Sequence, residues 1–136
     1  MMRRLVTGFG VALCLAASLS AQAADGAPRC KRDGNTQEMK VCAMNDYKVA
    51  DRRLNKVYKA LMAATPEARK TSLRDEQRAW LNMRDPTCMR QTEGEKGGTI
   101  WPLEFVSCQQ EKTQARTQQL EVQLDSLRTA AGQPGK

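Results

Sequence analysis

Apolar residues recur with helical spacing in three segments of the chain. In the first segment, from residue 36, they alternate steps of four and three: Ala43, Tyr47, Ala50, Leu54, Val57 and Leu61. This spacing predicts an amphipathic helix of about seven turns that begins at Thr36 as the N-cap. The basic side chains fall largely off the apolar stripe, as expected of a solvent-facing side: Lys40, Lys48, Arg52, Lys56 and Lys59.

A second helix is expected over residues 66–85. Thr65 is suited to its N-cap, and Pro66 is suited to its first position. Pro86 should end it, because proline removes a backbone donor inside a helix. Since the link over 62–65 is short, the first two helices should form an antiparallel hairpin. The predicted buried side carries Leu73, Gln77, Trp80, Leu81 and Arg84.

The third helix follows a glycine-containing segment. Residues 87–101 mix charges with three glycines and lack periodicity, which predicts an exposed loop. Pro102 then opens a helix with a polar middle, where we expect ion pairs to the second helix. The apolar residues of this helix are Phe105, Val106, Cys108, Leu120, Leu124 and Leu127, and the expected ion-pair residues are Arg78, Arg84, Asp85 and Arg116.

No segment alternates with period two, so the pattern predicts an all-α fold. We expect a small three-helix up-down-up bundle with two disulfides. Aromatic residues are few, with two each of Trp, Tyr and Phe, so aliphatic side chains must build most of the core. The expected core residues are Tyr47, Leu54, Tyr58, Leu73, Trp80, Leu120 and Leu124.

The first 23 residues are typical of a secretory signal peptide. Arg3 and Arg4 precede an uncharged stretch over residues 5–19, and small residues follow at Ala21 and Ala23. Cys14 lies within that stretch and raises the alternative of a lipoprotein. Lipid attachment favours a small residue before the cysteine, however, and a leucine stands there. We therefore expect cleavage after residue 23 and a periplasmic or secreted protein.

The rest of the chain divides into a polar tether at 24–35, a helical domain at 30–130 and a disordered tail at 131–136. No stretch after the signal reaches the roughly 20 apolar residues of a membrane span. The whole chain has 22 basic and 15 acidic residues, so losing two arginines with the signal leaves a net charge of +5. This charge favours solubility but selects no partner by itself.

Four cysteines follow the signal: Cys30, Cys42, Cys88 and Cys108. An even number in a small exported domain predicts two disulfides. A zinc site is the competing interpretation, but the chain has no histidine and no CxxC pair. Four cysteines allow three pairings. Matching the heights of the expected helix ends favours Cys30 with Cys88 and Cys42 with Cys108.

The absence of histidine excludes a Ser-His-Asp or Cys-His catalytic arrangement. Paired carboxylates remain at Asp75 with Glu76 and at Asp46 with Asp51, but such spacing is common on solvated helix faces. The glycine-rich segment 93–98 has two acids and no following GK[ST], so it is not a phosphate-binding loop. We expect no catalysis, no cofactor and no metal.

Four groups of short motifs in order resemble the LprI-like lysozyme inhibitor family, and the resemblance covers about residues 30–124. They are Cys30 with Thr36-Gln37-Glu38-Met39, Cys42-Ala43, Tyr47, Ala50-Asp51, Leu54-Asn55 and Tyr58; Leu73-Arg74, Gln77-Arg78-Ala79-Trp80, Arg84-Asp85 and Cys88; Gly97-Gly98-Thr99; and Cys108, Thr113, Arg116 and Leu120. The resemblance implies a helical, exported protein whose partner is a lysozyme.

This resemblance suggests a protein that binds a cell-wall hydrolase and blocks its cleft. Within the segment 89–100, glycines allow close backbone approach, and a central lysine can pair with the carboxylates of a glycosidase cleft. The expected contact residues are Glu93, Lys96, Gly97, Gly98 and Thr99. The alternative is a non-inhibitory module that holds an anionic envelope polymer or acidic protein through the basic face of the first helix. Neither hypothesis involves specific binding of nucleic acid.

Overall fold

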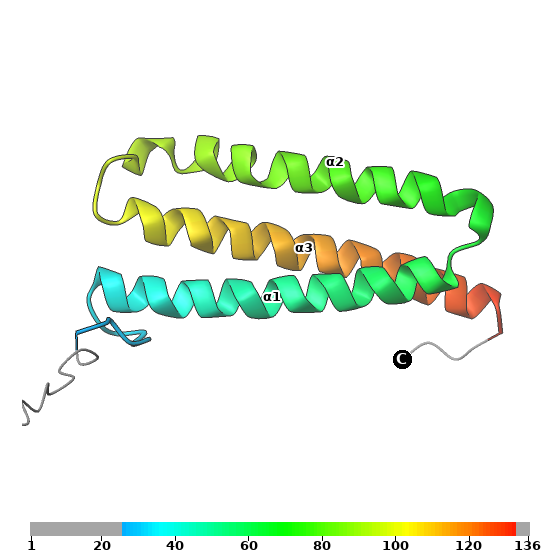
Figure 1. The fold of residues 1–136 in the computed structure, drawn as a ribbon, viewed down its shortest axis with the longest axis horizontal. Coiled ribbons are helices and arrows are strands. Elements are labelled where there is room, and N and C mark those ends of the chain that lie inside the picture. Colours follow the sequence, from blue (N-terminus) through cyan, green and yellow to red (C-terminus); the bar gives the residue numbers. More distant parts are fainter. Residues whose placement is uncertain (1–25, 133–136) are drawn as a thin grey trace, which may run out of the picture.

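The computed structural model describes residues 26–132, and the signal peptide expected over residues 1–23 lies outside this range. Three long helices lie side by side along their length (Figure 1). They are α1 (Thr36–Ala64), α2 (Glu67–Gln91) and α3 (Trp101–Ala130), with a short 3-10 turn, η1 (Glu93–Glu95), between the last two. The predicted all-α, three-helix, up-down-up arrangement is confirmed, since α2 runs opposite to α1 and α3.

The helix starts differ from the predicted ones by one residue each. Asn35, not Thr36, caps α1: its side chain accepts from the backbone N–H groups of Gln37 and Glu38, and the Glu38 carboxylate accepts from the Asn35 N–H in return. Thr65 does not cap α2. Its hydroxyl and its backbone N–H both donate to the carbonyl of Leu61 and so close the last turn of α1.

Pro86 does not end α2, which continues for five residues to Gln91. A proline inside a helix removes one backbone hydrogen bond and costs about 3 kcal/mol. Contacts on either side of Pro86 offset this cost: Asp85 accepts a hydrogen bond from Gln109 of α3, and Cys88 is bonded to Cys108. Thr92 caps the end of the helix: its hydroxyl and its N–H both donate to the Cys88 carbonyl.

The disulfides join Cys30 to Cys42 and Cys88 to Cys108, so the expected pairing was wrong. That pairing assumed that Cys88 lies beyond the end of α2. Because α2 continues past Pro86, Cys88 instead faces α3, and its Cα lies 5.6 Å from that of Cys108. Cys30 belongs to a turn before α1 that brings it to Cys42, with a Cα–Cα distance of 4.5 Å.

The core is a cluster of five buried leucines from all three helices: Leu54, Leu61, Leu73, Leu120 and Leu124. Four of these are expected core residues. Tyr58 and Trp80 pack against the cluster but stay partly exposed. Tyr47 lies apart from the leucines, and its ring packs on the Arg84 guanidinium at 5.2 Å.

The polar middle of α3 is buried. Thr113 and Thr117 are 0% and 3% exposed, and their hydroxyls donate to the carbonyls four residues earlier in the same helix. Each hydroxyl thus has its hydrogen-bond partner within its own helix, so Thr113 and Thr117 can be buried without a polar partner on another helix. α1 and α3 form the most extensive helix contact of the described chain.

α2 contacts the other helices partly through polar side chains. The Arg84 guanidinium lies 5.2 Å from the Tyr47 ring centroid and 5.6 Å from that of Trp80, and it donates to the adjacent Asp85 carboxylate at 2.8 Å. Arg116 donates to Gln77 across α2 and α3 at 3.0 Å. Within residues 26–132 no ion pair joins α2 to α3, so the expected ion-pair layer was wrong; hydrogen bonds between a charged side chain and a glutamine take its place. Arg78 faces Asp75 on the exposed side of α2.

Candidate functional site

The segment expected to bind a partner lies at one end of the bundle, beside the start of α1 (Figure 1). Met89 belongs to the last turn of α2, so the true loop is shorter than expected and runs over residues 92–100, including η1. The Cys88–Cys108 disulfide joins the two helices that the loop connects. Thr92, the first residue of the loop, is 9% exposed, and its hydroxyl donates to the Cys88 carbonyl of α2. The loop therefore rises from a cross-linked base.

Backbone hydrogen bonds give the loop a defined shape. The N–H groups of Lys96 and Gly98 donate to the carbonyls of Glu93 and Glu95 at 3.1 and 2.9 Å. Gly97 has φ of +88°, a conformation that favours glycine. A Cβ at Gly98 would lie 3.1 Å from the Glu95 carbonyl oxygen, so this position also has little room for a side chain.

The five expected contact residues all lie within this loop and are exposed: Glu93, Lys96, Gly97, Gly98 and Thr99. Lys96 lines a hollow of about 90 Å³ together with Met89, Arg90, Glu93 and Trp101. Its ammonium group forms no ion pair within residues 26–132. The loop thus presents a positive charge that has no ion-pair partner in the described chain, following two acidic residues, Glu93 and Glu95.

Behind the loop, the first turns of α3 carry a stacked aromatic pair. The rings of Trp101 and Phe105 lie 5.4 Å apart between centroids and are inclined by 22°. The Trp101 indole N–H is buried and donates to no group of the described chain. Trp101 also lines the hollow that Lys96 and Glu93 of the loop border.

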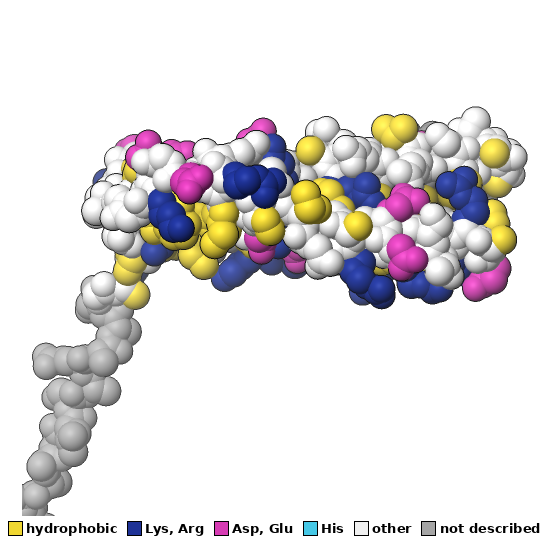
Figure 2. Space-filling view, turned by 90° about the horizontal axis from the view of Figure 1, so that it is seen from above, with side chains coloured by type: hydrophobic (Ala, Val, Ile, Leu, Met, Phe, Trp, Pro, Cys, Tyr) yellow, Lys and Arg dark blue, Asp and Glu magenta, His cyan; other side chains and the backbone are white. Residues whose placement is uncertain are grey.

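Exposed apolar side chains surround the same end of the bundle. Figure 2 shows hydrophobic atoms gathered on the half of this face that is nearer the loop. Exposed residues near this end include Met44 at 42%, Met83 at 56%, Met89 at 52% and Ile100 at 38%. Methionine is common on surfaces that adapt to a protein partner. These residues were not predicted as contact residues from the sequence, although methionine on the solvent side of an amphipathic helix is a usable signal.

Burial and polar contacts shift the pKa of three groups along the helices. Burial alone would raise the pKa of Asp85, but hydrogen bonds from Arg84 and Gln109 outweigh it and lower the pKa below its usual value. Burial raises the pKa of Tyr47. Burial also lowers the pKa of Arg116, and one of its guanidinium nitrogens has no hydrogen-bond partner.

Within residues 26–132, no three acidic or cysteine side chains lie close enough together to hold a metal ion. None of the three helices combines the length and apolar character needed to cross a membrane.

The fold and the disulfides define a small cystine-stabilised helical protein with an exposed end loop. The family model "Lysozyme inhibitor LprI" matches residues 28–120, so the chain belongs to the LprI lysozyme inhibitor family. An uncharacterized protein of Rhizobium meliloti (strain 1021) is 29% identical to it over 92% of this chain and 98% of the relative. No solved structure matches the chain. Family membership accords with a role outside the cytoplasm and with a protein partner rather than catalysis.

Proposed function

We propose that this protein binds a lysozyme or a related cell-wall hydrolase and blocks its cleft with the loop over residues 92–100. The geometry of the loop is the main support for this proposal. The loop is exposed at the end of the bundle, and the Cys88–Cys108 disulfide joins the two helices at its base. A preshaped loop loses less conformational freedom on binding than a flexible one, which favours affinity.

The chemistry of the loop fits a glycosidase cleft. Glycosidases use a pair of carboxylates, and Lys96 offers an ammonium group with no internal ion pair in the described chain. Gly97 and Gly98 keep the backbone beside it free of side chains. The exposed methionines Met83 and Met89 add apolar area next to the loop, as the core of a protein interface requires.

The test is a charge reversal at the tip of the loop. Lys96→Glu places a negative charge against the carboxylates of the cleft, and like charges in a desolvated contact cost several kcal/mol. Stability should stay within about 0.5 kcal/mol of wild type, as for most surface changes. Inhibition is measured as lysozyme activity on bacterial cell walls against protein concentration, with chicken-type, goose-type and invertebrate-type enzymes. A melting curve for each variant checks the fold.

The control variant carries Lys48→Glu and Lys56→Glu on the exposed side of α1. Under the proposed function this variant inhibits like wild type. If this control variant loses binding to peptidoglycan and acidic polymers while Lys96→Glu keeps it, the result supports the alternative of a polyanion-binding module. Unchanged inhibition by Lys96→Glu refutes the loop as the blocking element. Absence of inhibition by the wild type in all three enzyme classes refutes the function.

A further inference from the structure

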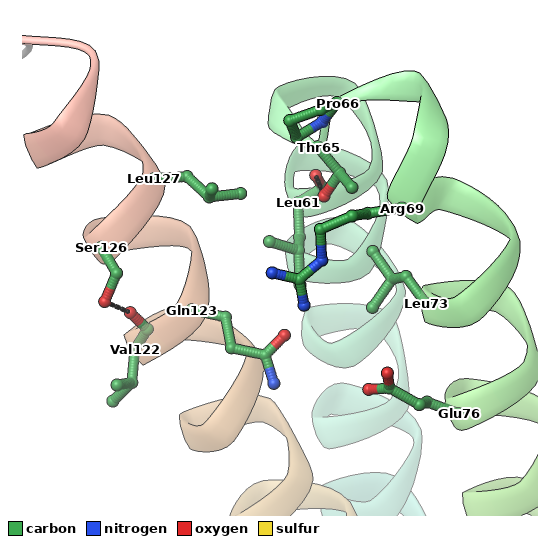
Figure 3. A pocket seen from close by; sticks show the side chains of 10 residues that line it. All are labelled: Leu61, Thr65, Pro66, Arg69, Leu73, Glu76, Val122, Gln123, Ser126 and Leu127. Atoms are coloured by element: carbon green, nitrogen blue, oxygen red, sulfur yellow. Dashed lines mark hydrogen bonds between the residues drawn. The ribbon is translucent and has the colours of Figure 1, made fainter.

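A second hollow lies at the end of the bundle opposite the loop, where α1 leads into α2 and α3 approaches its end (Figure 3). Its volume is about 300 Å³, which is within the range of small-molecule sites. All three helices contribute to its apolar walls through Leu61, Pro66, Leu73, Val122 and Leu127. Val122 is 67% exposed at the rim, the largest exposed fraction among the big apolar side chains of the described chain.

The polar groups of this hollow are unequally satisfied. The hydroxyls of Thr65 and Ser126 donate to carbonyls of their own helices. The Glu76 carboxylate accepts from the Ser72 hydroxyl at 3.1 Å and is attracted by the Arg116 guanidinium. The two hydroxyls therefore already have partners, and Glu76, which is exposed, keeps its negative charge on the side of the hollow toward Ser72.

Two exposed donors at the wall of the hollow, Arg69 and Gln123, have no partner within the described part of the protein. Figure 3 shows the Arg69 guanidinium reaching from α2 into the space between the helices, with the Gln123 amide of α3 facing the same space. Neither side chain forms a hydrogen bond or ion pair with any residue of the described range 26–132. Apolar walls around one free cation and one free amide favour a ligand with an apolar body and a single anionic head.

We propose that this hollow binds a monocarboxylate with an aliphatic tail, such as a medium-chain fatty acid. The carboxylate would pair with Arg69, Gln123 would donate to it, and the tail would lie against Leu61, Leu73 and Leu127. The volume of about 300 Å³ is at the lower end of small-molecule sites, which favours a short tail such as that of octanoate. A doubly charged phosphate fits less well, because Arg69 is the one cation among the lining residues and Glu76 among them is an anion.

The experiment is isothermal titration calorimetry of the whole exported protein with sodium octanoate. Ten heavy atoms at ordinary ligand efficiency predict a dissociation constant of about 0.1 to 1 mM with one site. Octylamine, which has the same tail and the opposite charge, should bind at least about tenfold more weakly, because Arg69 repels it. Equal affinity for octanoate and octylamine overturns the proposal.

Two arginine variants provide the matched test. Arg69→Gln removes the charge from the hollow and should weaken octanoate binding about tenfold or more. Arg78→Gln removes an exposed arginine of the same helix that pairs with Asp75 outside the hollow, and it should bind like wild type. Equal losses in both variants indicate a general charge effect and overturn the proposal, as does an unchanged affinity in Arg69→Gln.

Chemical-shift mapping by NMR fixes the place of binding. Octanoate should shift amides within residues 61–76 and 120–128 and leave the loop at 92–100 unchanged. Shifts concentrated at the loop overturn the assignment to this hollow. The proposal does not depend on lysozyme inhibition, which Arg69→Gln is expected to leave intact because Arg69 lies at the opposite end of the bundle.

Discussion

The two disulfides close rings of similar size but hold different parts of the molecule. Cys30 and Cys42 are 12 residues apart, and Cys88 and Cys108 are 20 apart. Loop-closure entropy alone predicts losses of about 2.8 and about 3.3 kcal/mol when each bond is removed. If ring size were decisive, replacing both cysteines of either pair by alanine would therefore destabilise the domain almost equally.

The structure predicts unequal losses instead. Cys30 is exposed in a turn before α1, where the Arg32–Asp46 ion pair is also exposed. Without the first disulfide this turn can detach while the three helices stay packed, so we expect a loss of about 1 kcal/mol or less, below the full ring-closure value. Cys88 is 0% exposed and attaches α2 to α3. Detaching α2 would uncover Leu73, so we expect the full loss of about 3 kcal/mol.

Guanidinium unfolding of the Cys30→Ala/Cys42→Ala and Cys88→Ala/Cys108→Ala variants, followed by circular dichroism, measures both losses. The second variant should be less stable than the first by about 2 kcal/mol. Peptide mapping without reduction should show the Cys30–Cys42 and Cys88–Cys108 links in the wild type. Equal losses, or a larger loss for the first variant, would refute the argument that position outweighs ring size.

Three further variants test the core and the polar contacts of α2. Leu120→Ala should lower the free energy of unfolding by about 2 to 5 kcal/mol, because Leu120 is 0% exposed within the leucine cluster; a loss under about 1 kcal/mol in denaturant titration contradicts this packing. Burial raises the pKa of Tyr47 in the folded state, so the contribution of Tyr47 to stability is intact below the unfolded pKa of about 10 and is lost as pH rises through the folded pKa. Tyr47→Phe should therefore reduce the fall in melting temperature at alkaline pH. The pKa of Asp85 is lowered in the folded state, so the contribution of Asp85 to stability is present above the unfolded pKa of about 3.9 and is lost as pH falls through the folded pKa. Asp85→Asn should weaken the loss of stability at acid pH. An unchanged dependence of melting temperature on pH would contradict the contacts of Asp85 with Arg84 and Gln109.

The helices and most of the core follow from local pattern. Apolar spacing identified three helices, and Leu54, Leu73, Leu120 and Leu124 lie in the buried cluster as expected. The placement of Lys96 in an exposed loop also followed from the glycines and mixed charges around it. These features depend on residues close together in the sequence, which is why periodicity and turn chemistry reveal them.

The features that were predicted wrongly depend on contacts between distant residues. Pro86 is a strong local stop signal, but Gln109 and Cys108 of α3 hold the residues on either side of it in a helix. The wrong length of α2 then led to the wrong disulfide pairing. The hollow around Arg69 was not foreseen either, because its walls come from three helices and no single segment shows it.

Both disulfides lie toward the loop end of the bundle, so the two ends of the molecule should differ in local unfolding. Fluctuations that open α2 should cost least in its first turn near Glu67, which is exposed and far from a disulfide, and most near Cys88. Amide hydrogen exchange along α2 should therefore slow from its first turns to its last. The loop is thus expected on the more constrained end of the protein, whereas Arg69 lies close to the end of α2 that no disulfide holds. A molecule bound in the hollow around Arg69 would contact all three helices and so hold them together reversibly. It should slow amide exchange in the first turns of α2, which no disulfide holds.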